Sequence, residues 1–339
     1  MSERKPILQP NEISNDTVVS MRTRIITALV AIAVVLPLVL FGDWAFFALI
    51  CLALIFGVIE IIRCAKRKYS KVLYVTALIL ALLVLSWNLI RHIPFNTSRP
   101  LFESYQTIYM SITIVFIGIC LASFTVMIDK GFTVVDACFI FTMVLLIALG
   151  FQSALFLRYY PSFLYHQANT DFPYFNLFDN LESSLLLVWI VVGACLNDAF
   201  AYFVGVFFGK NKLNERISPK KTWEGFFGGV ILTAITLTAW ALVQDGASQG
   251  NHSILKGLLD LEHWYHVVIL SILIPLVSVL GDLVFSSIKR FYGIKDFSNI
   301  LPGHGGVLDR VDSMTFAMIA SSIYICIFFN HGAGGFLFP

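Results

Sequence analysis

Charged side chains gather near the C-terminal end of a chain that is otherwise strongly apolar. The stretch from Ser286 to Ser313 reads SSIKRFYGIKDFSNILPGHGGVLDRVDS, and one more carboxylate lies just upstream of it. Lysine and arginine side chains bind phosphates, while carboxylates are the hard oxygen ligands that Mg²⁺ prefers. The stretch therefore predicts a site for phosphates and a metal ion. The predicted site comprises the upstream Asp282 and the charged and imidazole side chains of the stretch, which are Lys289, Arg290, Lys295, Asp296, His304, Asp309, Arg310 and Asp312.

Asp282 lies near the end of an apolar helix that we expect over residues 264–287. Positions i+4, i+7 and i+8 hold Ser286, Lys289 and Arg290, so one stripe of the helix runs from the carboxylate to two cations. A carboxylate at membrane depth costs several kcal/mol and normally faces protein or a wet cavity. Metal ligation is favoured because more carboxylates follow, and a buried ion pair with Lys289 is the structural alternative.

The sequence LPGHGG, residues 301–306, lacks apolar periodicity and predicts a tight loop. Its glycines, Gly305 and Gly306 among them, allow backbone N–H groups to approach an anion closely. His304 lies between glycines, where we expect it to contact a phosphate or another part of the substrate. The GHGG string alone would be weak evidence, and the charged residues at these spacings make it strong.

The sequence LDRVD leads into the last expected helix, over residues 313–331. Asp309 and Asp312 are three residues apart and share a face if helical structure has already begun there. Arg310 then points elsewhere and can reach a phosphate with two N–H groups. Asp309 could also cap the helix, a structural role that is compatible with metal ligation.

Two further polar segments lie upstream. Asn197 and Asp198 interrupt an apolar segment and predict a polar helix face, for which a hydrogen bond between helices is the structural alternative. Lys220 and Lys221 precede Thr222, a candidate N-cap, so they stand beside a helix N-terminus that favours anions. Membrane topology alone would also place part of this basic charge here.

Apolar residues make up 58% of the chain and charged residues 13%, far from the balance of soluble proteins. Apolar runs of about 17–25 residues recur, each long enough to cross the roughly 30 Å hydrocarbon core of a bilayer as a helix. We therefore expect an all-α, polytopic integral membrane protein with about nine transmembrane helices. The segments lie near residues 25–41, 44–62, 72–90, 107–128, 134–157, 185–208, 223–243, 264–287 and 313–331.

The basic residues indicate an orientation. With a cytoplasmic N-terminus, 19 of the 23 lysines and arginines fall in cytoplasmic segments and 4 on the opposite face. We expect a cytoplasmic polar tail over 1–24, scaffold helices over 25–184 and a catalytic region with cytoplasmic loops over 185–339. The scaffold would supply a lipid-facing wall or the contacts of a homodimer. Its basic cluster from Arg63 to Lys71, without carboxylate or glycine partners, predicts a surface for anionic headgroups.

Phosphate-binding cations beside carboxylates are typical of phosphoryl or nucleotidyl transfer, where positioning and charge neutralisation provide most of the catalysis. The sequence contains no GxxxxGK[ST] or HExxH motif. An attacking phosphate is already ionised at pH 7 and needs no protein base, which leaves the carboxylates free to hold a metal. A kinase acting on a lipid alcohol would instead need one carboxylate to accept a proton.

The pattern S-x-I-K-R-x4-K-D-x-S-x2-L-P-x-H-G-G-V-x-D-R-V-D, from Ser286 to Asp312, resembles the signature of phosphatidate cytidylyltransferases, the CDP-diacylglycerol synthases. The segments NDAFAYFVG and ISPKKTWEG also resemble that family, so the resemblance covers residues 185–330. Ser298 is a departure, because glycine is frequent there in relatives, and it puts a close backbone approach at that position in doubt.

The resemblance implies that CTP and phosphatidic acid give CDP-diacylglycerol and pyrophosphate, with Mg²⁺ required and a second cation left open. It implies that Asp282 and Asp309 hold the metal. The expected catalytic set is Asp282, Asp309, Asp312, Lys289 and Arg310, and the expected substrate-binding set is Asn197, Asp198, Lys220, Lys221, Ser286, Arg290, Lys295, Asp296, His304, Gly305 and Gly306.

Two other functions are weighed against this one. The first is a CTP-dependent transferase or kinase of another lipid, such as a polyprenol. The second is an ion-coupled secondary transporter, which predicts inverted repeats and broken helices that are not evident in the sequence. Expected partners are CTP, phosphatidic acid and membrane lipids, with no nucleic acid. The modest length favours a bacterial plasma membrane over the endoplasmic reticulum.

Overall fold

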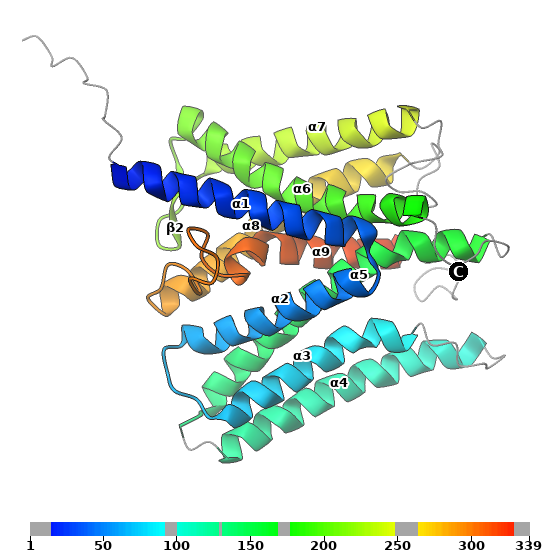
Figure 1. Ribbon diagram of the computed structural model, residues 1–339, viewed down its shortest axis with the longest axis vertical. Helices are drawn as coiled ribbons and strands as arrows, with labels where there is room; N and C mark the ends of the chain where they lie inside the picture. Colours follow the sequence, from blue (N-terminus) through cyan, green and yellow to red (C-terminus); the bar gives the residue numbers. More distant parts are fainter. Residues whose placement is uncertain (1–14, 92–99, 129–130, 169–176, 248–263, 329–339) are drawn as a thin grey trace, which may run out of the picture.

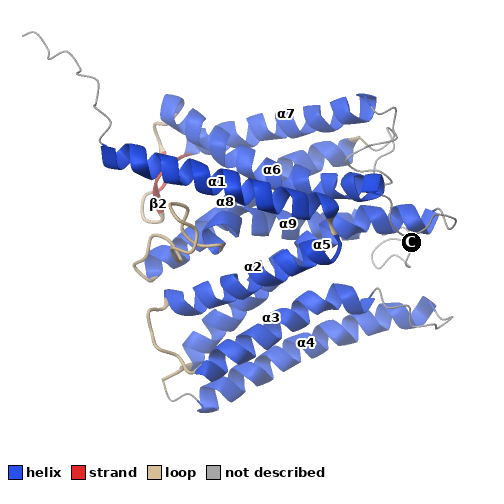
Figure 2. Cartoon of the chain, viewed as in Figure 1, coloured by secondary structure: helices blue, strands red, loops and turns tan. Residues whose placement is uncertain are grey.

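The computed structural model describes residues 15–91, 100–128, 131–168, 177–247 and 264–328. Over these residues the chain forms nine α-helices and one two-stranded hairpin (Figures 1 and 2). Each apolar segment expected from the sequence coincides with one helix, which confirms the helical fold class. In chain order the elements are α1 (Asn15–Phe41), α2 (Asp43–Cys64), α3 (Lys71–Arg91), α4 (Pro100–Ile128), α5 (Val134–Ala168), α6 (Leu177–Phe208), β1 (Lys212–Asn214), β2 (Ser218–Thr222), α7 (Trp223–Ala247), α8 (Tyr265–Phe291) and α9 (Leu308–Phe328).

Six helices contain, within the described residues, a segment long and apolar enough to cross a membrane. These segments are Trp44–Cys64, Val134–Tyr159, Ser184–Phe208, Trp223–Gln244, Tyr265–Phe291 and Leu308–Phe328. The described apolar parts of the other three helices are shorter, at Ile25–Phe41, Lys71–Ser86 and Thr113–Ile128. These apolar helices mark the chain as a helical membrane protein.

Two of the expected domain limits fall inside helices. α1 begins at Asn15, inside the segment 1–24 that was expected to be a polar tail, while residues 1–14 lie outside the described part. The boundary expected at residue 184 between scaffold and catalytic region falls inside α6, which begins at Leu177. Hydropathy marks only the part of a helix that lies in hydrocarbon, whereas backbone hydrogen bonding continues beyond it.

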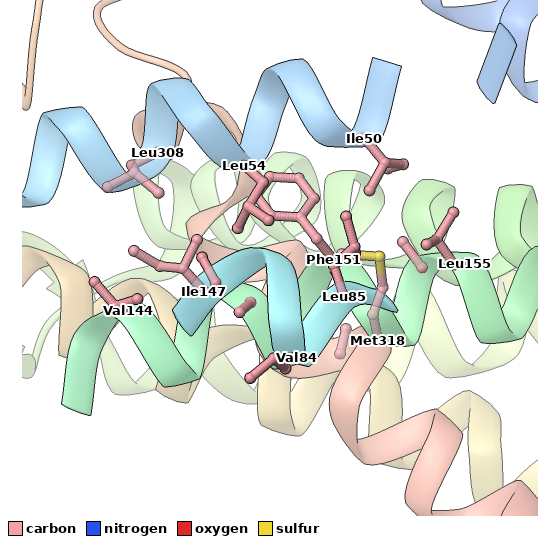
Figure 3. Close-up of a cluster of buried hydrophobic side chains, with 14 of the residues drawn as sticks. Ile50, Leu54, Val84, Leu85, Val144, Ile147, Phe151, Leu155, Leu308 and Met318 are labelled. Atoms are coloured by element: carbon pink, nitrogen blue, oxygen red, sulfur yellow. The ribbon is translucent and has the colours of Figure 1, made fainter. Parts of the chain in front are cut away.

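α5 lies at the centre of the bundle, where it packs against α2, α3, α4, α6 and α9. In the buried cluster of Figure 3, Ile147 of α5 lies with Leu54 of α2 and Leu308, the first residue of α9. Small residues permit the close approach, since a Cβ on Gly150 would lie 2.4 Å from a methyl carbon of Thr315 in α9. The N-terminal and C-terminal helices therefore share one core.

The hairpin and the loop between α8 and α9 lie at the same end of the bundle, on the left in Figure 1. β1 and β2 pair antiparallel, a detail that the sequence did not predict. The hydroxyl of Thr222 accepts the N–H of Gly225 at 3.1 Å, which confirms the expected N-cap of α7. Glu224 accepts the N–H groups of Lys210 and Asn211 at 3.1 and 3.2 Å, and so holds the base of the hairpin against α7.

Candidate active site

Lys289 joins α8 to α9 through two carboxylates. Its Nζ donates a 2.9 Å hydrogen bond to Oδ1 of Asp309 and lies 3.5 Å from Oδ2 of Asp312. Each of these three residues is only 8% exposed, and buried charges are costly unless they are paired. The expectation that Asp309 and Asp312 share a helix face is confirmed, because one ammonium group contacts both.

The second oxygen of Asp309 organises the loop that precedes α9. Its Oδ2 accepts the N–H of Phe297 at 2.8 Å and the N–H of Gly306 at 2.9 Å, so the expected capping role is present. Gly305 has φ +84°, and a Cβ there would lie 2.9 Å from the same oxygen. Glycine is therefore required at that position, and the loop is built around one carboxylate.

Asp282 connects α8 to the hairpin. The ammonium group of Lys221, on β2, donates a hydrogen bond to Oδ2 of Asp282. The hydroxyl of Ser286, one helical turn later, donates to Oδ1 at 3.4 Å, along the stripe expected from the sequence. The neighbouring Lys220 is exposed. Of these two lysines, Lys221 is therefore the one whose side chain links the hairpin to α8.

Carboxylates from three helices gather at one place. Asp198 of α6 interacts electrostatically with Asp282 and with Arg310. Asp312 interacts with both Asp198 and Asp282. α8 and α9 approach closely there because Gly281 lacks a side chain, and a Cβ at that position would lie 2.7 Å from the carbonyl oxygen of Asp312. The structure therefore places the predicted acidic residues around the crossing of α8 and α9.

Asn197, the neighbour of Asp198, makes a different contact. It is fully buried, and its Nδ2 donates to the carbonyl oxygen of Pro275 in α8 at 3.4 Å. This is the hydrogen bond between helices that the sequence left open as an alternative. Adjacent residues project about 100° apart around a helix, so the two polar side chains have different neighbours. A role for Asn197 in substrate binding stays a prediction.

Several cations of the expected site remain accessible. His304 is half-buried, and its Nδ1 has no hydrogen-bond partner among the described residues. Asp296 is exposed on the same loop. Since Lys221 and Lys289 are bound to carboxylates, phosphates would be bound by the remaining cations. Four basic side chains of the expected site are exposed and have no carboxylate of a described residue within salt-bridge distance: Lys220, Arg290, Lys295 and Arg310.

Whether a divalent cation fits depends on the free lone pairs of the carboxylates. Among the described residues, no three histidine, cysteine, aspartate or glutamate side chains are close enough to hold a metal ion without other ligands. A carboxylate offers about four lone-pair sites, of which Asp309 uses three and Asp282 uses two. Both retain acceptor capacity, so the chemistry of these donors suits a cation that also takes oxygen ligands from substrate phosphates.

One carboxylate at this end of the molecule was not predicted from the sequence. Glu60 of α2 accepts hydrogen bonds from the N–H groups of Val307 and Leu308. It also accepts one from the hydroxyl of Ser298, the position at which relatives often carry glycine. The only sequence signal was a lone acidic residue in an apolar segment, shortly before the basic cluster that begins at Arg63.

Comparison with known proteins identifies the family of the chain. The model of the cytidylyltransferase family matches residues 22–328. The phosphatidate cytidylyltransferases of Staphylococcus epidermidis and Bacillus subtilis are each 30% identical to the chain, over 298 and 302 residues that cover 88% of it and 96% of the relative. That of Haemophilus influenzae is 41% identical over 149 residues, 44% of this chain and 46% of the relative. With the family match and the first two relatives extending over most of its length, the chain belongs to the cytidylyltransferase family.

Proposed function

We propose that the chain is a phosphatidate cytidylyltransferase, which converts CTP and phosphatidic acid to CDP-diacylglycerol and pyrophosphate. Two relatives with this name align over 96% of their own length. The observation that carries the proposal is the α8–α9 junction, where Lys289 pairs with Asp309 and Asp312 next to accessible cations. A site of this kind in a membrane protein suits one lipid phosphate and one nucleoside triphosphate.

We infer that the lipid phosphate attacks the α-phosphorus of CTP in line with the departing pyrophosphate. A bond forms between an oxygen of the lipid phosphate and the α-phosphorus. The bond from the α-phosphorus to the oxygen that bridges it to the β-phosphorus breaks, and its electron pair leaves with pyrophosphate. A phosphate monoester has its second pKa near 6, so its oxygen is already anionic at pH 7 and the attack needs no protein base.

The chain's own residues divide this work between them. Lys220, Lys295 and Arg310 are exposed and would bind the phosphates of CTP and the lipid. Lys221 and Lys289 are bound to carboxylates and would keep those carboxylates in position. Because the attacking and leaving groups are both anionic, positive charge held in place before the reaction lowers the barrier.

Asp282 and Asp309 are the residues that would hold Mg²⁺, through the lone pairs that their protein contacts leave free. Mg²⁺, when bound, neutralises charge on the leaving pyrophosphate. The hairpin and α8 orient the two carboxylates, since Lys221 contacts Asp282 and Lys289 contacts Asp309.

We further propose nine membrane spans, with the N-terminus and the active site on the cytoplasmic side. The distribution of lysine and arginine supports this orientation, because 19 of 23 then lie in cytoplasmic segments. The bacterial relatives favour a plasma membrane. Phosphatidic acid would then enter from the inner leaflet. A homodimer through the N-terminal helices stays a prediction.

The proposal is tested with purified protein, vesicles containing phosphatidic acid, Mg²⁺ and CTP labelled in its cytosine ring. We expect the label in the lipid fraction together with equimolar release of pyrophosphate. A lipid kinase would instead leave the label in CDP and phosphorylate an alcohol such as a polyprenol. Absence of labelled lipid with phosphatidic acid would contradict the proposed function.

A further inference from the structure

Glu60 is a buried carboxylate that reaches the loop before α9 from the N-terminal half of the chain. It is 1% exposed. Its Oε1 accepts the N–H of Val307 at 2.9 Å and the hydroxyl of Ser298 at 2.6 Å, and its Oε2 accepts the N–H of Leu308 at 2.8 Å. Both oxygens of one side chain therefore bind the segment where α9 begins.

This placement is electrostatically favourable. The first N–H groups of a helix have no partner within the helix, and the N-terminal end carries a partial positive charge. Glu60 satisfies the N–H of Leu308, the first residue of α9, and the N–H before it. A carboxylate at this depth would otherwise be costly, so the contact stabilises both the acid and the helix terminus.

Packing around Glu60 fixes where α9 begins. Leu308 lies against Gly57, one turn before Glu60 on α2, and a Cβ on Gly57 would lie 3.1 Å from its methyl group. A Cβ on Gly306 would lie 2.5 Å from Oε1 of Glu60, so any side chain there would displace the carboxylate. α2 therefore contacts the start of α9 through the carboxylate of Glu60 and through the packing of Leu308 against Gly57.

Two carboxylates divide the N–H groups of this loop between them. Asp309 accepts the N–H of Gly306, and Glu60 accepts the next two N–H groups along the chain. The anion that the backbone of this segment binds is thus a side chain of the protein itself. Phosphates would be bound by side chains such as Arg310 instead, while Glu60 sets the position of Asp309 on the first turn of α9.

We infer that Glu60 is a positioning residue for nucleotidyl transfer: from α2 it holds the start of α9, and through it the carboxylates of Asp309 and Asp312. The kinetic part of this inference rests on the proposed function. Glu60 contacts the loop and not the exposed cations, so its loss should disturb the reacting geometry more than substrate affinity. The N-terminal helices then belong to the construction of the active site.

Glu60→Gln tests the inference with little change of volume. An amide has only one acceptor oxygen, so either Val307 or Leu308 loses its partner whichever way the amide is turned. We expect kcat to fall about 10- to 100-fold, as for other residues that orient reactive groups, while KM for CTP and for phosphatidic acid changes less than about threefold. Glu60→Asp, which keeps the charge, should recover part of the lost kcat.

Hydrogen exchange provides a measurement that does not depend on activity. In Glu60→Gln the amides of residues 298–308 should exchange faster than in the wild type, while those of the hairpin should not change. The matched control is Asp136→Asn at the same end of the bundle, where Asp136 and Thr133 satisfy each other's N–H groups at the start of α5. That variant should keep kcat within about twofold.

Wild-type kcat and unchanged exchange in folded Glu60→Gln would overturn the inference, and so would an equal loss of kcat in Asp136→Asn. If Glu60→Gln does not fold, Ser298→Ala decides, since it removes only the hydroxyl, which donates to Glu60 and accepts the N–H of Ile300 at 3.3 Å. We then expect about a two- to tenfold lower kcat and faster exchange at Val307 and Leu308, whose N–H groups bind Glu60, and no change in either would overturn the inference. If the wild type makes no CDP-diacylglycerol, the proposed function is contradicted. Hydrogen exchange would still measure whether Glu60 stabilises the loop.

Discussion

Lys289 and Asp309 lie on different helices and 20 residues apart, yet their side chains form a buried ion pair of 2.9 Å. The same aspartate accepts two N–H groups from the loop between those helices. The ammonium group therefore links the end of α8 to the conformation of the loop and to the first turn of α9. Removing it would leave Asp309 and Asp312 buried without a shared cation.

We predict that Lys289→Met lowers turnover more than it weakens substrate binding. Methionine keeps most of the length of the side chain but carries no charge, so the two carboxylates repel each other without compensation. We expect kcat to fall about 100-fold and the free energy of unfolding to fall by about 3–5 kcal/mol. Steady-state kinetics and unfolding in detergent measure the two effects. The control is Lys212→Met, at an exposed position of the hairpin. Wild-type kcat in Lys289→Met would rule out the role of the ion pair.

The adjacent lysines of β2 provide a second, internally matched prediction. Lys221 contacts Asp282, whereas Lys220 is exposed. Lys221→Met should lower kcat about tenfold or more, because the hairpin loses its contact with α8 and Asp282 loses its cation. Lys220→Met should raise KM for a phosphate-bearing substrate by about threefold at nearly constant kcat, and added salt should reduce this difference. Identical kinetic changes in the two variants would contradict the assignment.

The helical architecture and the local contacts of the site were predictable from the sequence. Segments that cross a membrane must be long and apolar, and apolar runs in the sequence mark the position of each described helix, six of which contain a described segment long and apolar enough to cross. The cap at Thr222 and the shared face of Asp309 and Asp312 also follow from spacing, because the interacting groups lie within one helical turn.

Contacts between distant segments were not predictable, because spacing relates only residues of one element. Glu60 binds the N–H of a residue 247 positions away, and its segment was expected to be scaffold. The basic cluster beginning at Arg63 was expected to lack acidic partners, and this was wrong for Arg67, which pairs with Asp136 at 3.2 Å. Such pairs depend on which helices become neighbours. The apolar surface of one helix does not specify which other helix packs against it.

A third prediction concerns stability away from the site. Arg158 is fully buried and donates from Nε to the carbonyl of Val39 at 2.7 Å and from Nη2 to that of Leu40 at 3.0 Å. Positive charge at the C-terminal end of α1 is favourable, and Gly42, at φ +72°, leaves room for the guanidinium. Arg158→Ala should lower the free energy of unfolding by about 3 kcal/mol. Turnover per folded molecule should not change, and a loss of kcat at unchanged thermal stability would contradict this explanation.

The two proposed metal ligands should be separable by hydrogen exchange. Asp282→Asn and Asp309→Asn should each abolish Mg²⁺-dependent turnover, because an amide is a much weaker ligand for a hard cation. Only Asp309→Asn should also raise exchange at Phe297 and Gly306, since Oδ2 of Asp309 accepts both of their N–H groups. Asp282 contacts Lys221 and Ser286 instead, so its loss should leave the loop protected.

Chelation by EDTA and return of Mg²⁺ provide the control for these two variants. The wild type should lose activity and regain it, and neither variant should regain it at tenfold higher Mg²⁺. Near-wild-type turnover in one variant would remove that aspartate from the metal role. Faster exchange in both variants would show that Asp282 also supports the loop, and the two carboxylates would then act as one structural unit around the crossing of α8 and α9.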